Sequence, residues 1–228
     1  MKITTCVFDA YGTLFDVAAA ARNLAERPGA GRIAEIWPQL AEIWRAKQLE
    51  YTWLRAAAGV HTDFRAVTRD GLDFAAEALG GLTEAEKTEL MALYDELEAY
   101  PEVPAMLAAL KAKGMRTAIL SNGSPAMLES AAKAAKLDHV LDALISVEGC
   151  GVFKPAHAVY DLVHRQFGTA SREVLFVSSN GWDAAAASGY GFRTLWVNRM
   201  GKPMDRLPWR PEAVAQDLTG VPAHAEGL

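Results

Sequence analysis

The feature that most constrains the fold of this chain is the order of its hydrophobic patterns. Residues 3–8 form a short apolar run, rich in β-branched residues, that ends at Asp9 and is typical of a buried strand. Apolar residues then recur at three- and four-residue spacing through most of residues 16–97, which is a helical period. From about residue 102, strand-like runs alternate with helical stretches. Because such alternation builds a parallel sheet, the early strand and the later ones belong together and the helical block is an insertion.

We therefore predict an α/β fold with a Rossmann-like, doubly wound parallel sheet as its core and an inserted helical cap. The predicted core comprises residues 1–15 and 98–228, and the predicted cap comprises residues 16–97. Pro38 falls inside the first long helical stretch and predicts a break there, or the first turn of a second helix. The tail after about residue 205 shows no clear pattern and is left unassigned.

Composition limits the classes of partner. The formal net charge is -5 and the isoelectric point is about 5.6, which argues against nucleic acid or an anionic membrane as the main partner. A small anionic substrate stays possible, because a pocket can be locally basic. No apolar run approaches the length needed to cross a bilayer. Of the two cysteines, Cys6 lies in the first predicted strand, so a structural disulfide is not expected and a reducing cytoplasm fits.

Polar residues collect where predicted strands end. Residues 9–13, 121–122 and 178–183 each follow an apolar strand run, and Lys154 comes just after a fourth one. In an open parallel sheet, ligands bind at the carboxyl ends of the strands. Each cluster alone could consist of turn and capping residues, but their joint placement at one edge of the sheet predicts an active site there.

Five sequence motifs make the chain recognisable. FDAYGTLFD (residues 8–16), LSNGSP (120–125), VFKPAHAVY (152–160) and FVSSNGWD (176–183) resemble, in this order, the signature motifs of the haloacid dehalogenase superfamily. The predicted cap segment WRAKQLEYTWLR (44–55) is similar to that of the L-2-haloacid dehalogenases. The resemblance implies hydrolysis of an (S)-2-haloalkanoate to the (R)-2-hydroxyacid and halide through a covalent ester. It also implies a cytoplasmic enzyme, commonly a homodimer, that uses no cofactor and no metal.

Two positions favour a dehalogenase over a phosphatase of the same superfamily. Phosphatases that match these motifs carry a general-acid Asp where this chain has Tyr11, and a magnesium-binding Asp where it has Ser179. Without those carboxylates, a hard cation lacks oxygen ligands and phosphoryl transfer lacks a proton donor. Halide leaves as a stable anion and needs neither.

The resemblance implies a role for each catalytic candidate. Asp9 would attack C2 of the substrate and form the ester, with Thr13 orienting its carboxylate. Lys154 would keep Asp9 ionised, because a nearby cation favours a charged carboxylate. Asp183, acting with Lys154, would activate the water that hydrolyses the ester. The predicted catalytic set is Asp9, Thr13, Lys154, Tyr160, Ser178, Asn180 and Asp183.

The substrate-binding candidates divide by the part of the substrate they would contact. A guanidinium is permanently charged and weakly hydrated, so Arg45 suits the leaving halide, a large anion. Backbone N–H groups suit the substrate carboxylate. The predicted binding set is Ala10, Tyr11 and Ser121 for the carboxylate, Arg45, Asn122 and Trp182 for the halide, and Leu49, Phe64 and again Tyr11 for the alkyl group.

Other interpretations stay open. Ordinary packing competes for Leu49, Phe64 and Trp182, and His157 is a less favoured general base because the implied mechanism needs no histidine. A related hydrolase that opens a strained ring or another activated bond at C2 would use the same scaffold. A promiscuous magnesium-dependent phosphatase and a non-enzymatic binding module are further alternatives.

Overall fold

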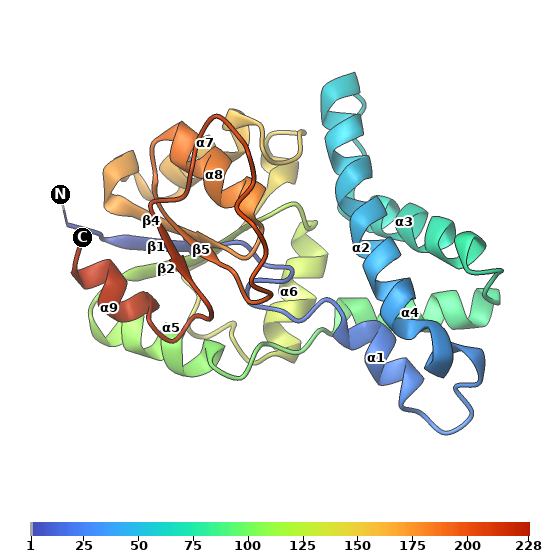
Figure 1. Cartoon of the computed structure of the whole chain (residues 1–228). Coiled ribbons are helices and arrows are strands. Elements are labelled where there is room, and N and C mark those ends of the chain that lie inside the picture. Colours follow the sequence, from blue (N-terminus) through green and yellow to red (C-terminus); the bar gives the residue numbers. More distant parts are fainter. Residues whose placement is uncertain (1) are drawn as a thin grey trace.

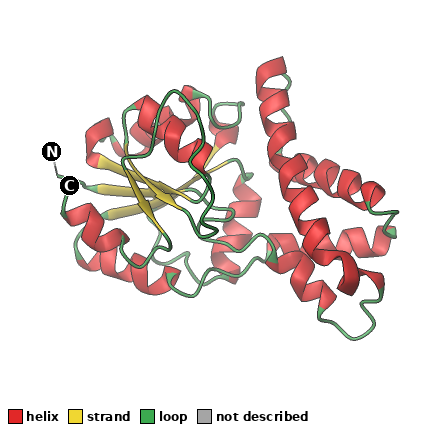
Figure 2. Ribbon diagram, in the orientation of Figure 1, coloured by secondary structure: helices red, strands yellow, loops and turns green. Residues whose placement is uncertain are grey.

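The computed structural model describes residues 2–228, and its centre is a six-stranded, all-parallel sheet (Figure 2). The strands lie in the order β3-β2-β1-β4-β5-β6. Their bounds are Thr5–Phe8 (β1), Arg116–Ser121 (β2), Ala143–Ser146 (β3), Val174–Ser178 (β4), Arg193–Val197 (β5) and Ala213–Ala215 (β6).

Helices cover both faces of the sheet, which explains why β1 and β4 are buried along their whole length. Helices α5, α6 and α9 lie on one face, and α7 and α8 on the other (Figure 1). Their bounds are Val103–Ala112 (α5), Pro125–Ala134 (α6), His157–Phe167 (α7), Gly181–Tyr190 (α8) and Val221–Glu226 (α9). We call the sheet and these helices the core.

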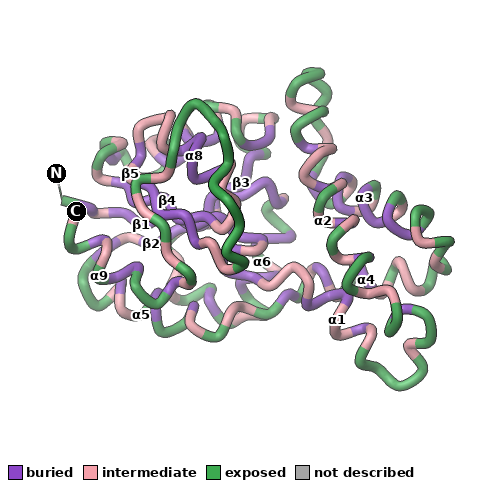
Figure 3. Tube along the Cα trace, viewed as in Figure 1, coloured by how far each residue is buried: buried purple, intermediate pink, exposed green. Residues whose placement is uncertain are grey.

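Four further helices pack against one another beside the core, and we call them the cap (Figure 1). The long helix α2 packs along α1 and α3, while α4 packs on α1 and α3. Their bounds are Ala19–Ala25 (α1), Arg32–Ala58 (α2), Phe64–Ala78 (α3) and Glu84–Asp95 (α4). Figure 3 shows a buried stripe along these helices where they face one another and exposed segments at the far end of the cap.

The two chain segments that join the cap to the core run side by side. The N–H of Asp16 donates to the carbonyl of Glu98 (2.9 Å), and the N–H of Tyr100 donates to the carbonyl of Leu14 (3.0 Å). This pairing ties both connections together next to the site described below.

The fold class predicted from the sequence is confirmed: the core is a doubly wound parallel sheet with a helical insertion after its first strand. The boundaries placed at residues 15/16 and 97/98 stay a prediction. The break predicted at Pro38 is wrong, because α2 continues through this residue. Pro38 cannot donate to the carbonyl of Ala34, but both residues lie on the exposed side of the helix, where water can replace the lost bond.

The tail left unassigned contributes to the core. After a long exposed loop, β6 extends the sheet beside β5 and α9 packs on α5 (Figure 1). Within residues 2–228, no helix is both long and apolar enough to cross a membrane.

Candidate active site

Asp9 lies at the middle of the carboxyl edge of the sheet, because it directly follows β1, the strand between β2 and β4. The register pairs Phe8 with Ile119 and with Val177, so the turns after all three strands converge on Asp9. Strands β2 and β3 lie in succession on one side of β1, and strands β4, β5 and β6 lie in succession on the other. Such a switch point is where ligands bind in open α/β sheets.

Three donors hold the carboxylate of Asp9, which is 6% exposed. The Lys154 ammonium donates to Oδ1 (3.0 Å). The Thr13 hydroxyl and the Asn180 side-chain amide donate to Oδ2 (3.0 and 2.9 Å). Side chains from three separate segments therefore set the orientation of this carboxylate.

Lys154 joins Asp9 to a second buried carboxylate. Its ammonium also donates to Asp183 Oδ2 (2.8 Å), and its side chain is 1% exposed. Burial opposes the charge on Lys154, but the carboxylates of Asp183 and Asp9 outweigh burial and raise the pKa of the ammonium. The lysine is therefore held as a cation between two acids.

Asp183 lies in the first turn of α8 and is fully buried. The hydroxyl of Tyr160, also fully buried, donates to its Oδ1 (2.8 Å). Burial raises the pKa of the Asp183 carboxyl, against the opposing effect of Lys154. The negative charge of nearby Asp9 adds to the effect of burial on the pKa of Asp183.

Thr13 connects the turns that follow β1 and β4. Its hydroxyl oxygen accepts from the N–H of Ser179 (2.8 Å), while its hydrogen reaches Asp9. Gly12, with φ +87°, makes the turn that brings Thr13 back towards Asp9, and a Cβ there would lie 3.2 Å from Ser179 Oγ. The local sequence therefore fixes the hydroxyl that orients the carboxylate.

The structure does not bring Ser178 to the carboxylate of Asp9. Its buried hydroxyl accepts from the N–H of Asn180 (3.1 Å) and so shapes the turn that presents Asn180. The backbone N–H groups of Ala10 and Tyr11, in contrast, donate to no group among residues 2–228. They are free to bind an anion.

Arg45 reaches the site from α2. One of its terminal nitrogens donates to Gln48 Oε1 (2.8 Å) and the other donates to the carbonyl of Tyr11 (3.0 Å). Gln48 is itself held, because its side-chain amide donates to the hydroxyls of Thr68 (2.7 Å) and Tyr94 (3.0 Å). Helices α2, α3 and α4 together hold the guanidinium over the edge of the sheet.

The side chains at this edge enclose a small cavity, which we call the inner pocket. Its remaining volume is about 10 Å³, roughly the space one water molecule needs. It is lined by Asp9, Tyr11, Arg45, Leu49, Phe64, Ser121, Asn122, Lys154, Asn180 and Trp182. All ten belong to the sites predicted from the sequence. Ala10, Thr13, Tyr160, Ser178 and Asp183 lie outside the lining.

A wider cavity of about 380 Å³ adjoins the inner pocket, and we call it the outer chamber. The two share Arg45, Leu49, Asn180 and Trp182 as a common wall. Arg199 and Lys202, from the loop after β5, also line the outer chamber.

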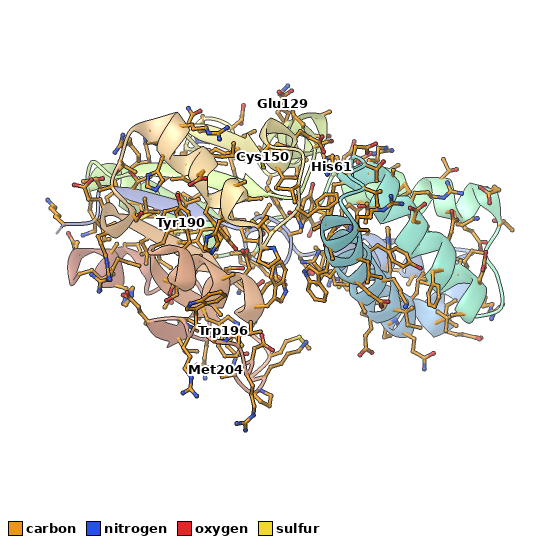
Figure 4. All side chains as sticks on the ribbon, turned by 90° about the horizontal axis from the view of Figure 1, so that it is seen from above. His61, Glu129, Cys150, Tyr190, Trp196 and Met204 are labelled. Atoms are coloured by element: carbon orange, nitrogen blue, oxygen red, sulfur yellow. The ribbon has the colours of Figure 1, made fainter. Side chains whose placement is uncertain are left out.

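Contacts of Trp53 and His61 also join the cap to the core around the inner pocket. Trp53 meets Trp182 edge to face, with ring centroids 5.3 Å apart. His61, labelled at the junction of the two parts in Figure 4, lies 3.1 Å from Glu148 Oε2 and packs against Phe153. His157 packs against Tyr190 and Trp209 and does not line the inner pocket.

Some residues at the site were missed by the sequence analysis. Gln48 and Tyr94 position Arg45, and Arg199 donates to the carbonyl of Thr13 (3.1 Å) while pairing with Glu102. Gln48 stands three residues after Arg45, on the same face of a helix, and this spacing was a usable signal. No local signal marked Tyr94 or Arg199, which come from distant segments.

Among residues 2–228, no group of three or more His, Cys, Asp or Glu side chains gathers in a way that could hold a metal ion.

Comparisons with known proteins agree on one family. Residues 3–191 match the family described as haloacid dehalogenase-like hydrolase. The chain is 44% identical to (S)-2-haloacid dehalogenase 1 from Pseudomonas sp. (strain CBS-3), over 89% of this chain and 88% of that protein. It is 42% identical to (S)-2-haloacid dehalogenase 4A from Burkholderia cepacia, over 89% and 86%.

A solved structure extends the likeness to three dimensions. The L-2-haloacid dehalogenase from Xanthobacter autotrophicus, solved with chloropropionic acid covalently bound, has a TM-score of 0.89 to this chain. The two are 35% identical, and the match covers 99% of each chain.

Proposed function

We propose, because this chain belongs to the haloacid dehalogenase-like hydrolase family, that it hydrolyses (S)-2-haloacids to (R)-2-hydroxyacids and halide. The observation that carries the proposal is the composition of the inner pocket. Within residues 2–228, Asp9 is the one carboxylate that lines it, and the lysine, arginine, amide and hydroxyl groups around it can bind an anion. A single held carboxylate facing an anion site is what nucleophilic displacement of halide requires.

In the first step, an oxygen of Asp9 attacks C2 of the substrate from the side opposite the halogen. The new C–O bond forms as the C–halogen electron pair leaves with the halide, which needs no proton. We assign the attack to Oδ1, which accepts from Lys154 alone, while Oδ2 accepts from Thr13 and Asn180. The product is an ester of Asp9 with inverted configuration at C2.

Three groups are suited to the leaving halide. Arg45 has no carboxylate partner among residues 2–228 and faces the inner pocket. The side-chain oxygen of Asn122 accepts from the N–H of Lys154 (3.0 Å). The amide hydrogens of Asn122 are therefore available to the halide. Trp182 adds the positive edge of an aromatic ring. Together they stabilise negative charge as it develops on the halogen.

In the second step, water attacks the carbonyl carbon of the ester. Asp183 accepts its proton, and Lys154 holds Asp183 and Asp9 in one network. The attack places negative charge on Oδ2, the carbonyl oxygen of the ester. Thr13 and Asn180, which donate to Oδ2 before the reaction, stabilise this charge. The bond between Asp9 Cγ and Oδ1 then breaks, Oδ1 leaves as the hydroxyl oxygen of the product and takes the proton held by Asp183, and the water oxygen completes a new Asp9 carboxylate. C2 is untouched in this step, so an (S)-2-haloacid yields the (R)-2-hydroxyacid, and the second proton of the water is released with the halide.

Halide release from (S)- and (R)-2-chloropropionate, measured with EDTA present, tests the proposed function. We expect release from the (S) isomer alone, together with (R)-lactate. Release from neither isomer, or only after Mg²⁺ is added, would contradict the proposal. Phosphate release from p-nitrophenyl phosphate with Mg²⁺ would then identify the phosphatase alternative.

We also propose a homodimer in the cytoplasm. Leu54 and Phe74 on the cap are 56% and 40% exposed, and apolar side chains of this kind suit a second copy of the chain. Cys6 and Cys150 are free thiols, which suits a reducing compartment. Light scattering should give a mass of about twice 24.6 kDa, whereas the single mass would rule out the dimer.

A further inference from the structure

The hydroxyl of Tyr11 has no hydrogen-bond partner although the residue is only 3% exposed. The ring lines the inner pocket and stacks on Tyr94, with centroids 5.4 Å apart and planes at 24°, and it also contacts Phe64. Phenylalanine would fill the same place without burying an unpaired polar group, which destabilises a folded protein. We therefore expect the Tyr11 hydroxyl to form a hydrogen bond with a bound ligand.

The location of this hydroxyl narrows the choice of partner. It lies beside Gly123, so close that a Cβ at that position would be 3.1 Å from it. This is the turn that carries Ser121, whose oxygen accepts from the N–H of Gly123 (3.1 Å) and whose hydrogen is free to donate.

The protonation of the Tyr11 hydroxyl also suits the role of a hydrogen-bond donor. Burial, reinforced by nearby Tyr94 and acidic groups, raises the pKa of Tyr11 well above its ordinary value. The phenol therefore keeps its proton at any working pH and offers a hydrogen to an anion. A neutral donor in a desolvated place binds a charged acceptor more strongly than it binds a neutral one.

We propose that the Tyr11 hydroxyl donates a hydrogen bond to the carboxylate of the bound 2-haloacid. It acts with the Ser121 hydroxyl, which the neighbouring turn carries, and with the free N–H groups of Ala10 and Tyr11. This inference rests on the proposed function, because it assigns a residue to the substrate of that reaction.

The variant Tyr11→Phe tests the proposal, with inhibition by propionate as the first readout. Propionate has the carboxylate of the substrate but no leaving group. Its inhibition constant should rise by roughly 10–100-fold, the effect of a hydrogen bond to a charged group. The inhibition constant of bromide should stay within about twofold of wild type. Because the bond is made in both the ground and transition states, KM for 2-chloropropionate should rise by a similar factor while kcat changes little.

Tyr51→Phe is the matched control, since Tyr51 lies on α2, lines neither the inner pocket nor the outer chamber, and makes no side-chain hydrogen bond within residues 2–228. Its kinetics should match those of wild type. The melting temperature of Tyr11→Phe should equal or exceed that of wild type, because no bond inside the protein is lost.

Three results would overturn the proposal. The first is an unchanged inhibition constant for propionate. The second is a rise for bromide instead of propionate, which would move the hydroxyl to the halide side. The third is a fall of several degrees in melting temperature, which would reveal a partner inside the protein. Wild-type enzyme is assayed in parallel. If the proposed function is wrong, wild type itself releases no halide, and this outcome is distinct from the three results above.

Discussion

Asp9 is the residue on which the proposed reaction depends, and Asp9→Asn removes its nucleophilic oxygen. Turnover of (S)-2-chloropropionate should fall by roughly 10⁴-fold or more. The fold should persist with equal or greater thermal stability, because Lys154 keeps its partner Asp183 and two carboxylates no longer share one cation. Near-normal halide release from the folded variant would remove Asp9 as the nucleophile.

Asp183 is buried against Lys154 and Tyr160, and its proposed task begins only after the ester forms. Asp183→Asn should therefore slow hydrolysis more than alkylation. Intact-protein mass spectrometry should show a one-to-one adduct in which Asp9 is esterified with the 1-carboxyalkyl group of the substrate. Retained activity without an adduct would exclude Asp183 as the group that activates water.

The acid limb of the pH profile follows from the same residue. Burial raises the pKa of Asp183 above its ordinary 3.8, and only the ionised carboxylate can accept the proton of water. Ester hydrolysis should consequently be lost as the pH falls through this raised pKa, and should recover as the pH rises. Single-turnover rates across the acid range measure this limb. The slow residual hydrolysis of Asp183→Asn should lack it, and an identical limb in the variant would assign it to another group.

At the scale of elements, three cap helices cooperate to place one guanidinium. Gln48 on α2 accepts from Arg45 and donates to Thr68 on α3 and to Tyr94 on α4. Gln48→Leu nearly keeps the volume but leaves Arg45 free to turn and removes the partner of the buried Tyr94 hydroxyl, whereas the Thr68 hydroxyl keeps its bond to the carbonyl of Phe64. We expect kcat/KM to fall by roughly 10–100-fold, as for a misplaced catalytic group, and unfolding free energy to fall by about 1–3 kcal/mol.

The control for this variant is Gln39→Leu, an exposed position on the same helix. It makes the same chemical change without touching Arg45, so both kinetics and stability should match wild type. Equal kinetics in the two variants would mean that Arg45 needs no support from Gln48.

Element boundaries also show where local patterns suffice. The capping box at Thr83 and Glu86, visible in the sequence, forms as expected at the start of α4. The prediction of a break at Pro38 was wrong because it considered local propensity and not tertiary packing. Helix α2 packs along α1 and α3, and this packing stabilises the helix where propensity alone would break it.

At the scale of the whole molecule, the inner pocket lies between cap and core, and Leu49 is the aliphatic side chain in the wall that it shares with the outer chamber. With only about 10 Å³ left inside, the lining must move for any substrate and must move further for a longer alkyl chain, so long substrates should react more slowly. Leu49→Ala joins the two cavities, so the ratio of activity on 2-chlorohexanoate to that on 2-chloropropionate should rise by roughly tenfold. Assays of both substrates give this ratio.

Leu54→Ala provides the comparison, because Leu54 lies on the same helix but is 56% exposed. It should leave the ratio unchanged. If Leu49→Ala also leaves it unchanged, Leu49 is not the wall that limits chain length.

The sequence by itself determined the fold class and the succession of strands and cap along the chain, because both follow from hydrophobic period, which is local. Short motifs that resemble those of a known family supplied fifteen candidate site residues, ten of which line the inner pocket. Packing interactions between distant segments are not local, and only the tertiary structure decided them. It placed Gln48, Tyr94 and Arg199 behind the site, turned Ser178 away from Asp9, carried α2 through Pro38 and left the Tyr11 hydroxyl without a partner.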